Sequence, residues 1–321
     1  ILAQAVSAPT TSACTALCRI RAACSASPPI MARPVRMVLF DLDGTLLGEG
    51  NKRVSTANAA AIARLREVGV RVVVITGRPA ASAWPIVEQI GPLDAVVVEG
   101  GCLVLGGDGQ PWCNRAMATS LVRALAAAAE EEHGVSAYVP TASGQIYCES
   151  LTSPVSRRIA EDFGLGDALR CVSRLAAFDF PREEVALRVH LEVAVADQQA
   201  LHRLRERIAA SALPCVVSAN EPQSLDIVPE GADKAAAMRQ VCERLGVDPG
   251  EALAFGDAEN DVGMLRDAGV GVAMENAVAS AKDQADIVIG HHGTDAIAEF
   301  LGNLGVDHRR EGTLLYEARV R

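Results

Sequence analysis

Residues 37–47 read Met-Val-Leu-Phe-Asp-Leu-Asp-Gly-Thr-Leu-Leu and carry the clearest structural signal in this chain. The apolar run 38–40 has the composition of a buried β-strand, and Gly44 allows a sharp turn after it. Asp41 and Asp43 therefore leave the carboxyl end of a strand, the edge at which α/β sheets build their sites. Two acids in different surroundings can divide the work of attack and proton transfer. The alternative is an ordinary Asp/Gly turn, and the rest of the sequence has to distinguish the two.

The segments that follow alternate between helix and strand patterns. A helical pattern begins after Ser55 and ends at Gly69, and a run of β-branched residues, interrupted only by Arg71, covers residues 70–75. Thr76-Gly-Arg-Pro ends that run, a second helical pattern follows, and residues 94–98 predict a third buried strand. This order predicts a doubly wound α/β core with a parallel sheet, and it places a hydroxyl at a second strand end.

The pattern changes between residues 102 and 220. Short strands around Gly-Gly-Asp-Gly at 106–109 predict a hairpin, and the Ala-rich residues 117–133 predict a helix. Further short strands and helices follow, as in an open antiparallel sheet with helices on it. We therefore predict an inserted α+β cap domain over residues 102–220.

The alternating pattern then resumes and continues to residue 301. Residues 233–245 predict a helix, residues 252–255 a buried strand, and Asp257-Ala-Glu-Asn-Asp the start of the next helix. The predicted division is a disordered or artefactual N-terminal extension, a discontinuous core, a cap and a C-terminal tail: 1–33, 34–101 with 221–304, 102–220, and 305–321.

The first 30 residues are considered apart from the fold. They are rich in Ala, Ser, Thr and Cys, contain Arg19 and Arg21 but no acid, and show no sustained period. This composition is compatible with a transit peptide. Because the chain begins with Ile1, an artefactual extension upstream of a start at Met31 is at least as good an interpretation.

The composition narrows the class of protein. Half of the 321 residues are hydrophobic, enough for two domains or one large one. A net charge of -10 argues against a general nucleic-acid or anionic-membrane surface but permits a local phosphate pocket. No apolar run reaches the roughly 18 residues of a membrane span. The nine cysteines form no C-x-x-C pair, so we predict reduced thiols in a cytoplasmic protein and consider organellar import less favoured. The oligomeric state is left open.

Polar groups stand at four predicted strand or helix ends: Asp41 with Asp43, Thr76, Lys234, and Asp257 with Asp261. Lys234 stands out because the chain has only three lysines. Acids, a hydroxyl and a lysine together predict Mg²⁺-assisted phosphoryl transfer, since Mg²⁺ prefers oxygen ligands and phosphate needs donors and positive charge. Each group also has a purely structural interpretation: Thr76 as part of a turn, Lys234 as a solvated helix residue, and Asp257 as a helix N-cap.

At four places, in order, the sequence resembles the motifs of the haloacid dehalogenase superfamily. The matching segments are Asp-Leu-Asp-Gly-Thr at 41–45, Ile-Thr-Gly-Arg at 75–78, Gly-Ala-Asp-Lys-Ala at 231–235, and Gly-Asp-Ala-Glu-Asn-Asp-Val-Gly-Met-Leu at 256–265. More narrowly, the chain resembles the Cof-type sugar-phosphatase branch, whose large cap lies between the second and third motifs. The resemblance covers about residues 35–301 and implies a HAD-like Rossmannoid core.

The resemblance implies catalytic roles for the matched residues. Asp41 would be the nucleophile that forms an aspartyl-phosphate, and Asp43 would protonate the leaving oxygen and then deprotonate water. Thr76 and Lys234 would bind and neutralise the phosphoryl group. The implied substrate-binding residues are Thr76, Gly77, Arg78, Lys234 and Asn260. For Arg78, an exposed structural arginine is an equal alternative.

The resemblance also implies a Mg²⁺ site. Asp41, the backbone carbonyl of Asp43, and Asp257 would hold the ion, with Asp261 as a further metal-site or positioning carboxylate. Three carboxylates this close repel one another, so a cation and Lys234 are also expected on electrostatic grounds.

Two further segments need a separate interpretation. Glu99-Gly-Gly stands where many relatives have Asn-Gly, and an acid there predicts a pocket that disfavours an anionic substrate group nearby. His291 and His292 follow the last core strand, and we favour a solvated loop over a metal site because no third ligand is evident.

The sequence thus predicts a Mg²⁺-dependent phosphatase for a phosphate monoester of a small metabolite, with a sugar or polyol phosphate favoured. The cap would close over the site, exclude bulk water and select the leaving group. The predicted partner is a small phosphorylated molecule, not nucleic acid or a membrane. A phosphomannomutase-like phosphosugar mutase and a non-catalytic phosphometabolite-binding module are the alternatives.

Overall fold

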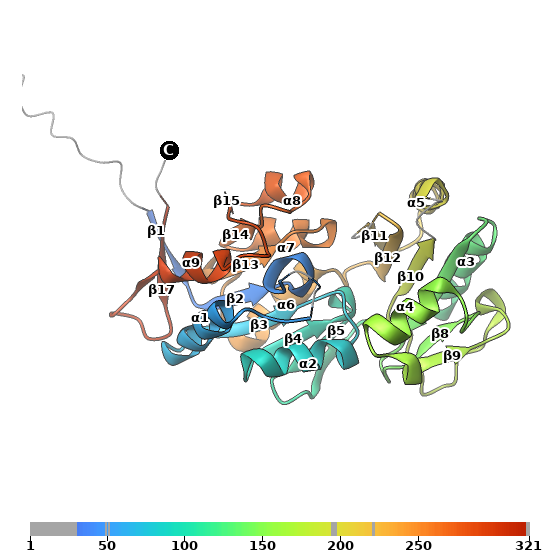
Figure 1. Cartoon of the computed structure of the whole chain (residues 1–321), viewed down its shortest axis with the longest axis horizontal. Helices are drawn as coiled ribbons and strands as arrows, with labels where there is room; N and C mark the ends of the chain where they lie inside the picture. The colour runs from blue at the N-terminus through green and yellow to red at the C-terminus, as the bar shows by residue number, and fades with distance from the viewer. Residues whose placement is uncertain (1–30, 49, 51, 194–197, 220–221, 319–321) are drawn as a thin grey trace, which may run out of the picture.

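The computed structural model describes residues 31–48, 50, 52–193, 198–219 and 222–318. The predicted N-terminal extension therefore lies outside the described residues up to position 30. Figure 1 shows two bodies side by side, the core on the left and the cap on the right. Within the described residues, no helix combines the length and the apolar character that crossing a membrane requires.

The core is built on one eight-stranded sheet with β2 at its centre. Its strands, in spatial order, are β15 (Ile287–Val288), β14 (Val270–Ala273), β13 (Ala252–Gly256), β2 (Met37–Phe40), β3 (Arg71–Ile75), β4 (Ala95–Val98), β5 (Leu103–Gly106) and β6 (Pro111–Asn114). The six strands from β15 to β4 are parallel, and β5 and β6 extend the sheet antiparallel. The doubly wound α/β fold predicted from the sequence is confirmed.

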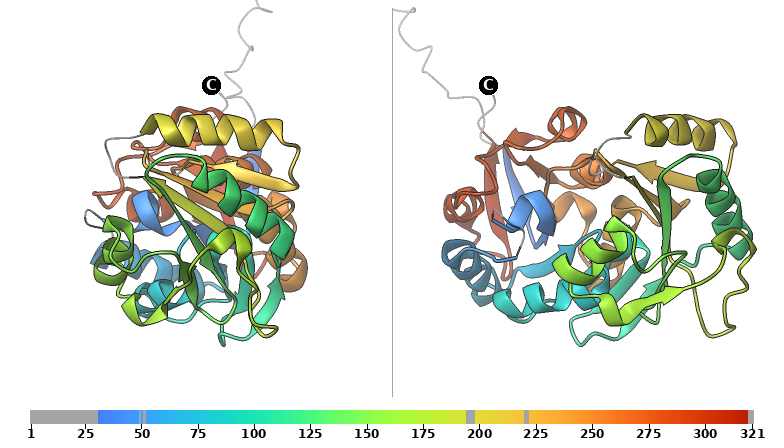
Figure 2. Two further views of the ribbon diagram at one scale, coloured as in Figure 1. Left: turned by 90° about the vertical axis from the view of Figure 1, so that its right-hand side faces the viewer. Right: turned by 45° about the vertical axis from the view of Figure 1, so that its right-hand side comes forward.

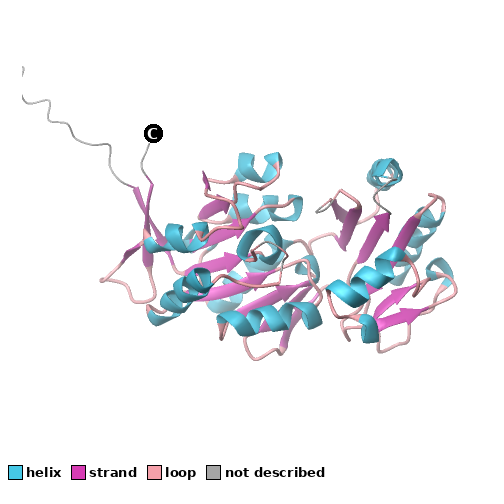
Figure 3. Ribbon diagram, viewed as in Figure 1, coloured by secondary structure: helices cyan, strands magenta, loops and turns pink. Residues whose placement is uncertain are grey.

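Helices cover both faces of this sheet (Figure 3). One face packs against α1 (Thr56–Glu67), α2 (Ala80–Ile90) and α9 (Ala296–Gly302), and the other against α6 (Lys234–Leu245), α7 (Val262–Asp267) and α8 (Ala279–Gln284). Alternate residues of β2 enter opposite cores: Val38 joins the first and Leu39 the second. Burial on both faces explains why the core strands are continuous apolar runs rather than alternating ones.

The cap has its own six-stranded sheet. In spatial order its strands are β11 (Cys215–Ser218), β12 (Ser224–Pro229), β10 (Val189–Val193), β7 (Val135–Pro140), β8 (Ile146–Cys148) and β9 (Leu169–Cys171). Neighbouring strands are antiparallel except β8 and β9.

Cap helices lie on both faces of that sheet. In the left view of Figure 2 the cap faces the viewer, and α3 (Thr119–Glu130) lies in front of its sheet, away from the core. α3 packs in the same apolar cluster as α5 (Gln198–Ala210). α4 (Pro154–Asp162) packs in a second cluster, with Tyr138 and Ile146 of the sheet. The face that carries α4 also borders the cleft described below.

The strand pairing moves both predicted edges of the cap. Residues 102–114 were assigned to the cap, but β5 pairs with β4 and so extends the core sheet. β12 was assigned to the core, but it lies between β10 and β11 in the cap sheet. The chain therefore enters the cap after β6 and leaves it after β12. Strand pairing is a long-range property, which the local pattern of a hairpin or a short strand does not reveal.

The chain ends are also more ordered than predicted within the described residues. β1 (Met31–Val35) pairs with β17 (Leu314–Ala318), and β16 (Gly305–Val306) joins them in a three-stranded sheet. The assignment of residues 31–33 to a disordered extension and of 305–318 to a tail is therefore wrong for these strands. Leu314 is buried in the core cluster, which gives this otherwise polar segment an apolar anchor.

Candidate active site

Asp41 and Asp43 follow the central strand of the core sheet. The backbone N–H of Asp41 donates to the carbonyl of Phe255, which keeps Asp41 in register with β13, and its side chain is buried. Asp43 lies in the turn η1 (Leu42–Leu46). Gly44 in this turn has φ +71°, and a Cβ there would collide with the Asp257 carboxylate. Only glycine therefore lets this turn approach Asp257 so closely.

Lys234 lies between Asp41 and Asp261 and hydrogen-bonds to both. It is the first residue of α6, is 1% exposed, and donates from Nζ to Oδ1 of Asp41 and to Oδ1 of Asp261, both at 2.7 Å. The N-terminus of α6 is fixed by Asp233, whose side chain accepts from the N–H of Ala236. The interpretation of Lys234 as a solvated helix residue is therefore wrong.

The buried charges shift one another's protonation. Burial alone would lower the pKa of Lys234, but the carboxylates of Asp261 and Asp41 raise it above its ordinary value. Burial raises the pKa of Asp41, and Lys234 opposes this only in part. Burial and the neighbouring Asp261 raise the pKa of Asp257 to about 7. One ammonium therefore does not compensate the three carboxylates, and the site favours a further cation.

Asp41, Asp257 and Asp261, which we call the acidic cluster, could hold that cation. One carboxylate oxygen from each lies within 4.8 Å of the others. Both oxygens of Asp261 are already hydrogen-bonded, Oδ1 to Lys234 and Oδ2 to the N–H groups of Asp257 and Ala258, at 3.0 Å each. Asp261 thus orients the ammonium and the loop after β13. Asp41 and Asp257 line the cleft described below and Asp261 does not, so Asp41 and Asp257 are the better ligands, and an all-oxygen donor set suits Mg²⁺.

Two neighbouring side chains hold Asp257 by hydrogen bonds. Thr45 Oγ1 donates to Asp257 Oδ1 at 2.8 Å. Asn276 Nδ2 donates to the carbonyl of Gly44 at 2.7 Å and to Asp257 Oδ2 at 3.3 Å. Asn276 was not predicted from the sequence. Its position, three residues after the end of β14, is the signal that could have identified it, because the carboxyl ends of parallel strands meet at one edge.

The two histidines do not join the acidic cluster in the described structure. The His292 N–H donates to Asn276 Oδ1 at 3.1 Å, and its ring Nδ1 lies 2.7 Å from the carbonyl of Leu47, which requires Nδ1–H. Both histidines lie in a loop, as predicted, but His292 is half-buried and its N–H holds Asn276 in place.

Thr76 and Arg78 stand at the end of the neighbouring strand β3. Thr76 is fully buried, and its Oγ1 accepts from the N–H of Arg78 at 3.1 Å. The Arg78 guanidinium binds Asp43 with two hydrogen bonds, Nε to Oδ2 at 2.7 Å and Nη2 to Oδ1 at 2.5 Å. Its side chain is 9% exposed and lies over the Phe163 ring of the cap. The alternative of an exposed structural arginine is therefore wrong.

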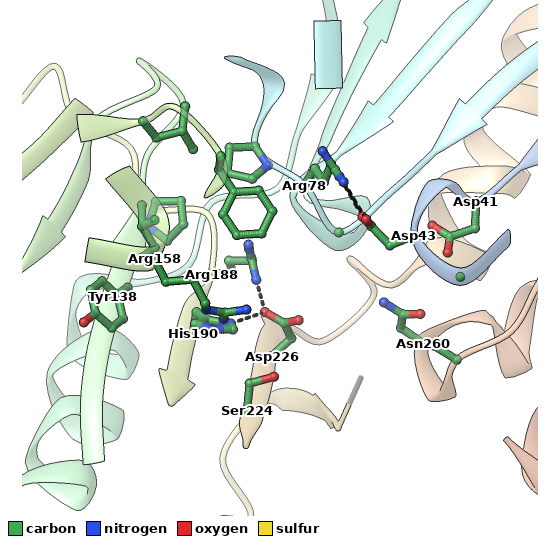
Figure 4. A pocket seen from close by; sticks show the side chains of 18 of the residues that line it. Asp41, Asp43, Arg78, Tyr138, Arg158, Arg188, His190, Ser224, Asp226 and Asn260 are labelled. Carbon is green, nitrogen blue, oxygen red and sulfur yellow. Dashed lines mark hydrogen bonds and ion pairs between the residues drawn. The ribbon is translucent and has the colours of Figure 1, made fainter. Parts of the chain in front are cut away.

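A cleft of about 650 Å³ separates the core site from the cap (Figure 4). The predicted residues that line it from the core are Asp41, Asp43, Gly77, Arg78, Lys234, Asp257 and Asn260. Asn260 Oδ1 is buried and has no hydrogen-bond partner among the described residues, so it can accept from a bound molecule. Thr76 precedes Gly77 in the chain and is not among the residues that line this cleft.

Six charged or titratable residues form a connected set that ties the cap to the core, and we call them the cap network: Glu99, Arg158, Arg188, His190, Glu192 and Asp226. Arg188 binds Glu99 through Nε at 2.8 Å and also pairs with Asp226. His190 lies 2.9 Å from Asp226 Oδ1 and 3.2 Å from Glu192 Oε2, and Arg158 donates to that same Glu192 oxygen at 2.7 Å.

Glu99 therefore acts differently from the prediction. It lies in η2 (Glu99–Gly101), where the chain leaves β4, and has φ +52°, which is rare outside glycine. Its carboxylate is buried against Arg188 rather than exposed in the cleft. The sequence did contain a signal for this network: Arg188 just before β10, and His190 and Glu192 within it, stand at alternate positions, which in extended backbone share one face.

Comparisons with known proteins agree with this architecture. A profile of the haloacid dehalogenase-like hydrolase family matches residues 38–301. A phosphoglycolate phosphatase of Pyrobaculum neutrophilum is 30% identical over 256 residues, which cover 79% of this chain and 89% of that protein. The pyridoxal phosphate phosphatase YbhA of Escherichia coli is 27% identical over 288 residues, covering 83% and 97%.

Solved structures share the fold. A haloacid dehalogenase-like hydrolase from Bacteroides thetaiotaomicron superimposes with a TM-score of 0.70 at 24% identity, covering 84% of this chain and 98% of its own. The subclass IIB sugar phosphatase BT4131 gives a TM-score of 0.69 at 22% identity, covering 84% and 98%. Both likenesses span the core together with the cap.

Proposed function

This chain belongs to the haloacid dehalogenase-like hydrolase family, and on that premise we propose a Mg²⁺-dependent phosphatase that cleaves phosphate monoesters of small metabolites through an aspartyl-phosphate. The family and the phosphatase class predicted from the sequence are confirmed by the matches. The observation that carries the finer proposal is the buried Lys234 between Asp41 and Asp261, at the floor of a cleft.

Asp41 is the proposed nucleophile. One of its carboxylate oxygens attacks phosphorus, the bond from phosphorus to the ester oxygen breaks, and the leaving oxygen takes a proton from Asp43. Asp43 then takes a proton from water, whose oxygen attacks the phosphorus. The bond to the Asp41 oxygen breaks, and inorganic phosphate is released. Lys234, hydrogen-bonded to Asp41, orients the carboxylate and offsets negative charge throughout.

Arg78 controls the position of the proposed acid and base. Its two hydrogen bonds hold both carboxylate oxygens of Asp43, so Asp43 must leave this pair before it can reach the leaving oxygen. A substrate phosphate that enters beside Arg78 competes for the same guanidinium. We therefore expect substrate binding to release Asp43 toward the leaving oxygen.

Asp41 and Asp257, with the backbone carbonyl of Asp43, are the proposed holders of Mg²⁺, and Asp261 keeps the loop and Lys234 in place. When bound, the ion would offset the excess carboxylate charge and polarise the phosphoryl group. Thr45 and Asn276 hold Asp257 in the orientation that this requires.

The cleft limits the substrate. A volume of about 650 Å³ between core and cap suits a small metabolite, and a sugar or polyol phosphate is the proposed class. A large phosphoprotein would fit poorly beneath the cap. The cysteines among the described residues are free thiols, and the cytoplasmic location stays a prediction.

The test is phosphate release from a panel of sugar, polyol, nucleotide and cofactor phosphates, with and without Mg²⁺. We expect release that requires Mg²⁺ and is lost in Asp41→Asn, while Asp179→Asn, a change at an exposed cap residue, leaves it intact. Hexose 1-phosphate tests the mutase alternative. Formation of hexose 6-phosphate without free phosphate would replace the hydrolase proposal, and binding without turnover would favour a binding module.

A further inference from the structure

Two cysteines stand directly opposite each other at one edge of the cap sheet. β9 is the edge strand and runs parallel to β8 (Figure 1), and the strand register pairs Cys148 with Cys171. Both are free thiols, and the proposed phosphatase mechanism uses neither of them. Whether the two thiols can react with each other depends on their separation, on the face that each occupies and on their access to solvent.

The pairing gives the two cysteines the separation and the orientation that a disulfide requires. Neighbouring strands lie about 4.8 Å apart, within the range of about 4.4–6.8 Å between the Cα atoms of disulfide-bonded cysteines. Residues paired in register point to the same face of a sheet. The preceding pair on this face, Ile146 and Leu169, packs in one apolar cluster with Cys148. The side chains of Cys148 and Cys171 therefore lie on the same face of adjacent strands.

Only weak contacts hold the two sulfur atoms at present. Cys148 Sγ lies 3.6 Å from the carbonyl oxygen of Ser150, and Cys171 Sγ lies 4.0 Å from that of Val172. A thiol is a weak hydrogen-bond donor, so side-chain rotation away from these carbonyls costs little.

The two thiols differ in their access to solvent. Cys171 is exposed, whereas Cys148 is only 1% exposed. Burial raises the pKa of the Cys148 thiol, and the neighbouring Cys171 adds to this shift. A dissolved reagent can therefore reach Cys171 directly, and the buried Cys148 is placed to react with the sulfur of Cys171.

No other cysteine of the described residues has a thiol opposite it in a sheet. Cys113 is paired with Val104, and Cys215 is paired with Pro229. The two remaining cysteines, Cys102 and Cys242, are buried outside the strands. Cys215 lies in β11, at the opposite edge of the same cap sheet, and so provides a matched control.

We propose that Cys148 and Cys171 form a thiol modification site, at which a low-molecular-weight disulfide such as glutathione disulfide forms a reversible cross-link between β8 and β9. The Cys171 thiol loses its proton, and its sulfur attacks one sulfur of glutathione disulfide. The S–S bond breaks, and one glutathione leaves and takes up a proton.

The Cys148 thiol completes the exchange. It loses its proton, and its sulfur attacks the sulfur of Cys171, so that the bond to the second glutathione breaks. That glutathione also leaves as a thiol. In total, two protein thiols are oxidised to a disulfide, and one glutathione disulfide is reduced to two glutathione thiols.

The cross-link fixes a segment that forms one wall of the cleft. β9 has three residues and, among the described strands, pairs with β8 alone. The chain reaches β9 from α4 through residues 163–168, of which Phe163 and Leu165 line the cleft. The Phe163 ring also lies under the guanidinium of Arg78, with its centroid 5.5 Å away. Joining Cys171 to β8 therefore holds the far end of the segment that carries both of these side chains.

The first experiment exposes the reduced, full-length protein to glutathione disulfide and maps its cysteines by mass spectrometry. Tryptic cleavage after Arg170 and Arg174 isolates Cys171 on a short peptide. We expect a pair of peptides joined through Cys148 and Cys171, lighter by two hydrogen atoms than its separate parts, which dithiothreitol separates. The proposal is overturned if Cys171 stays bound to glutathione, stays unmodified or joins another cysteine.

Three variants assign the two steps. Cys148→Ala keeps a small apolar side chain at the buried position and should leave Cys171 as a mixed disulfide with glutathione. Cys171→Ser changes an exposed side chain and should leave Cys148 unmodified. Cys215→Ser should form the cross-link as the wild type does. Modification of Cys148 in Cys171→Ser would contradict the proposed order of attack. If Cys148→Ala does not fold, the wild-type map and Cys171→Ser still decide.

Hydrogen exchange then measures the effect on the cleft wall. Amide exchange across residues 163–171 should slow at least about tenfold in the cross-linked protein, because a bond between the two strands disfavours opening of the edge strand. Cys171→Ser treated in the same way should show no change. Unchanged exchange in the cross-linked wild type would overturn the proposed effect on the wall. Neither measurement uses phosphate release, so both outcomes are independent of the proposed function.

Discussion

The acidic cluster of the core and the cap network both bury carboxylates beside cations, but they balance charge differently. In the core, Asp41, Asp257 and Asp261 surround the single ammonium of Lys234. In the cap network, Arg158 and Arg188 bind the carboxylates directly. The core is left with negative charge that a metal ion would offset, whereas each carboxylate of the cap network has a guanidinium partner.

The two regions therefore differ in what they can bind: the acidic cluster can bind a cation, whereas the carboxylates of the cap network are already paired. Where buried carboxylates lack enough cations, burial raises their pKa values, as at Asp41 and Asp257. Binding of a cation would stabilise the ionised carboxylates. A paired network has little attraction for additional ions, but it holds the cap strands in one geometry. The following changes test this contrast, beginning with the largest expected effect.

Lys234→Met should be the most damaging single change. It leaves Asp41 and Asp261 buried without their shared cation, and removing one partner of a buried pair costs about 3–5 kcal/mol of unfolding free energy. Urea unfolding measures the loss, and phosphate release should disappear with it. Lys282→Met on α8 is the matched control and should change stability little. A loss below about 1 kcal/mol in Lys234→Met would mean that the acids do not depend on the ammonium.

Arg188→Met should destabilise the cap network by about 3 kcal/mol, because it leaves Glu99 buried without its guanidinium. Glu99→Gln in the same chain removes the stranded charge and should restore part of that stability. The double-mutant cycle by urea unfolding should give a coupling of about 2 kcal/mol. Additive effects would show that the two side chains stabilise the protein independently.

Mg²⁺ should raise the free energy of unfolding by binding at the acidic cluster, and this increase should not depend on the cap network. At about 100 times its dissociation constant, an ion that binds only the folded chain adds about 2.7 kcal/mol. The increase in Tm should vanish in Asp257→Asn and persist in Asp226→Asn. Loss of the shift in both variants, or its absence in the wild type, would contradict an ion site confined to the acidic cluster.

Arg205→Ala should have the smallest effect. Arg205 of α5 pairs with Glu259 of the core, which also accepts from the N–H of Ala219 at 2.9 Å. This pair joins cap to core, as Glu99 and Arg188 do, but its side chains are 37% and 31% exposed. Exposed pairs contribute at most about 1 kcal/mol, so unfolding should change by less than that. A loss above about 2 kcal/mol would mean that burial is not what separates strong from weak links here.

Only some of the site was accessible from the sequence. Short motifs at strand and helix ends predicted five of its residues: Asp41, Asp43, Lys234, Asp257 and Asp261. Asn276 and the cap residues of the cap network were not, since a position just after a strand and an alternation of charged residues are weaker signals than a motif. Glu99 was predicted to act in the pocket, but its carboxylate is buried against Arg188, which lies 89 positions away in the chain.

The sequence by itself determined the core. Apolar runs bounded by turns specify strands and helices through local preferences, and alternation of the two allows few topologies. Only the tertiary structure decided which strands lie beside one another: that β5 extends the core sheet, that β12 joins the cap, and that β17 pairs with β1. The physical reason is that an element forms from neighbours in sequence, whereas strand pairing and buried ion pairs join residues far apart, where many partners satisfy the same local pattern.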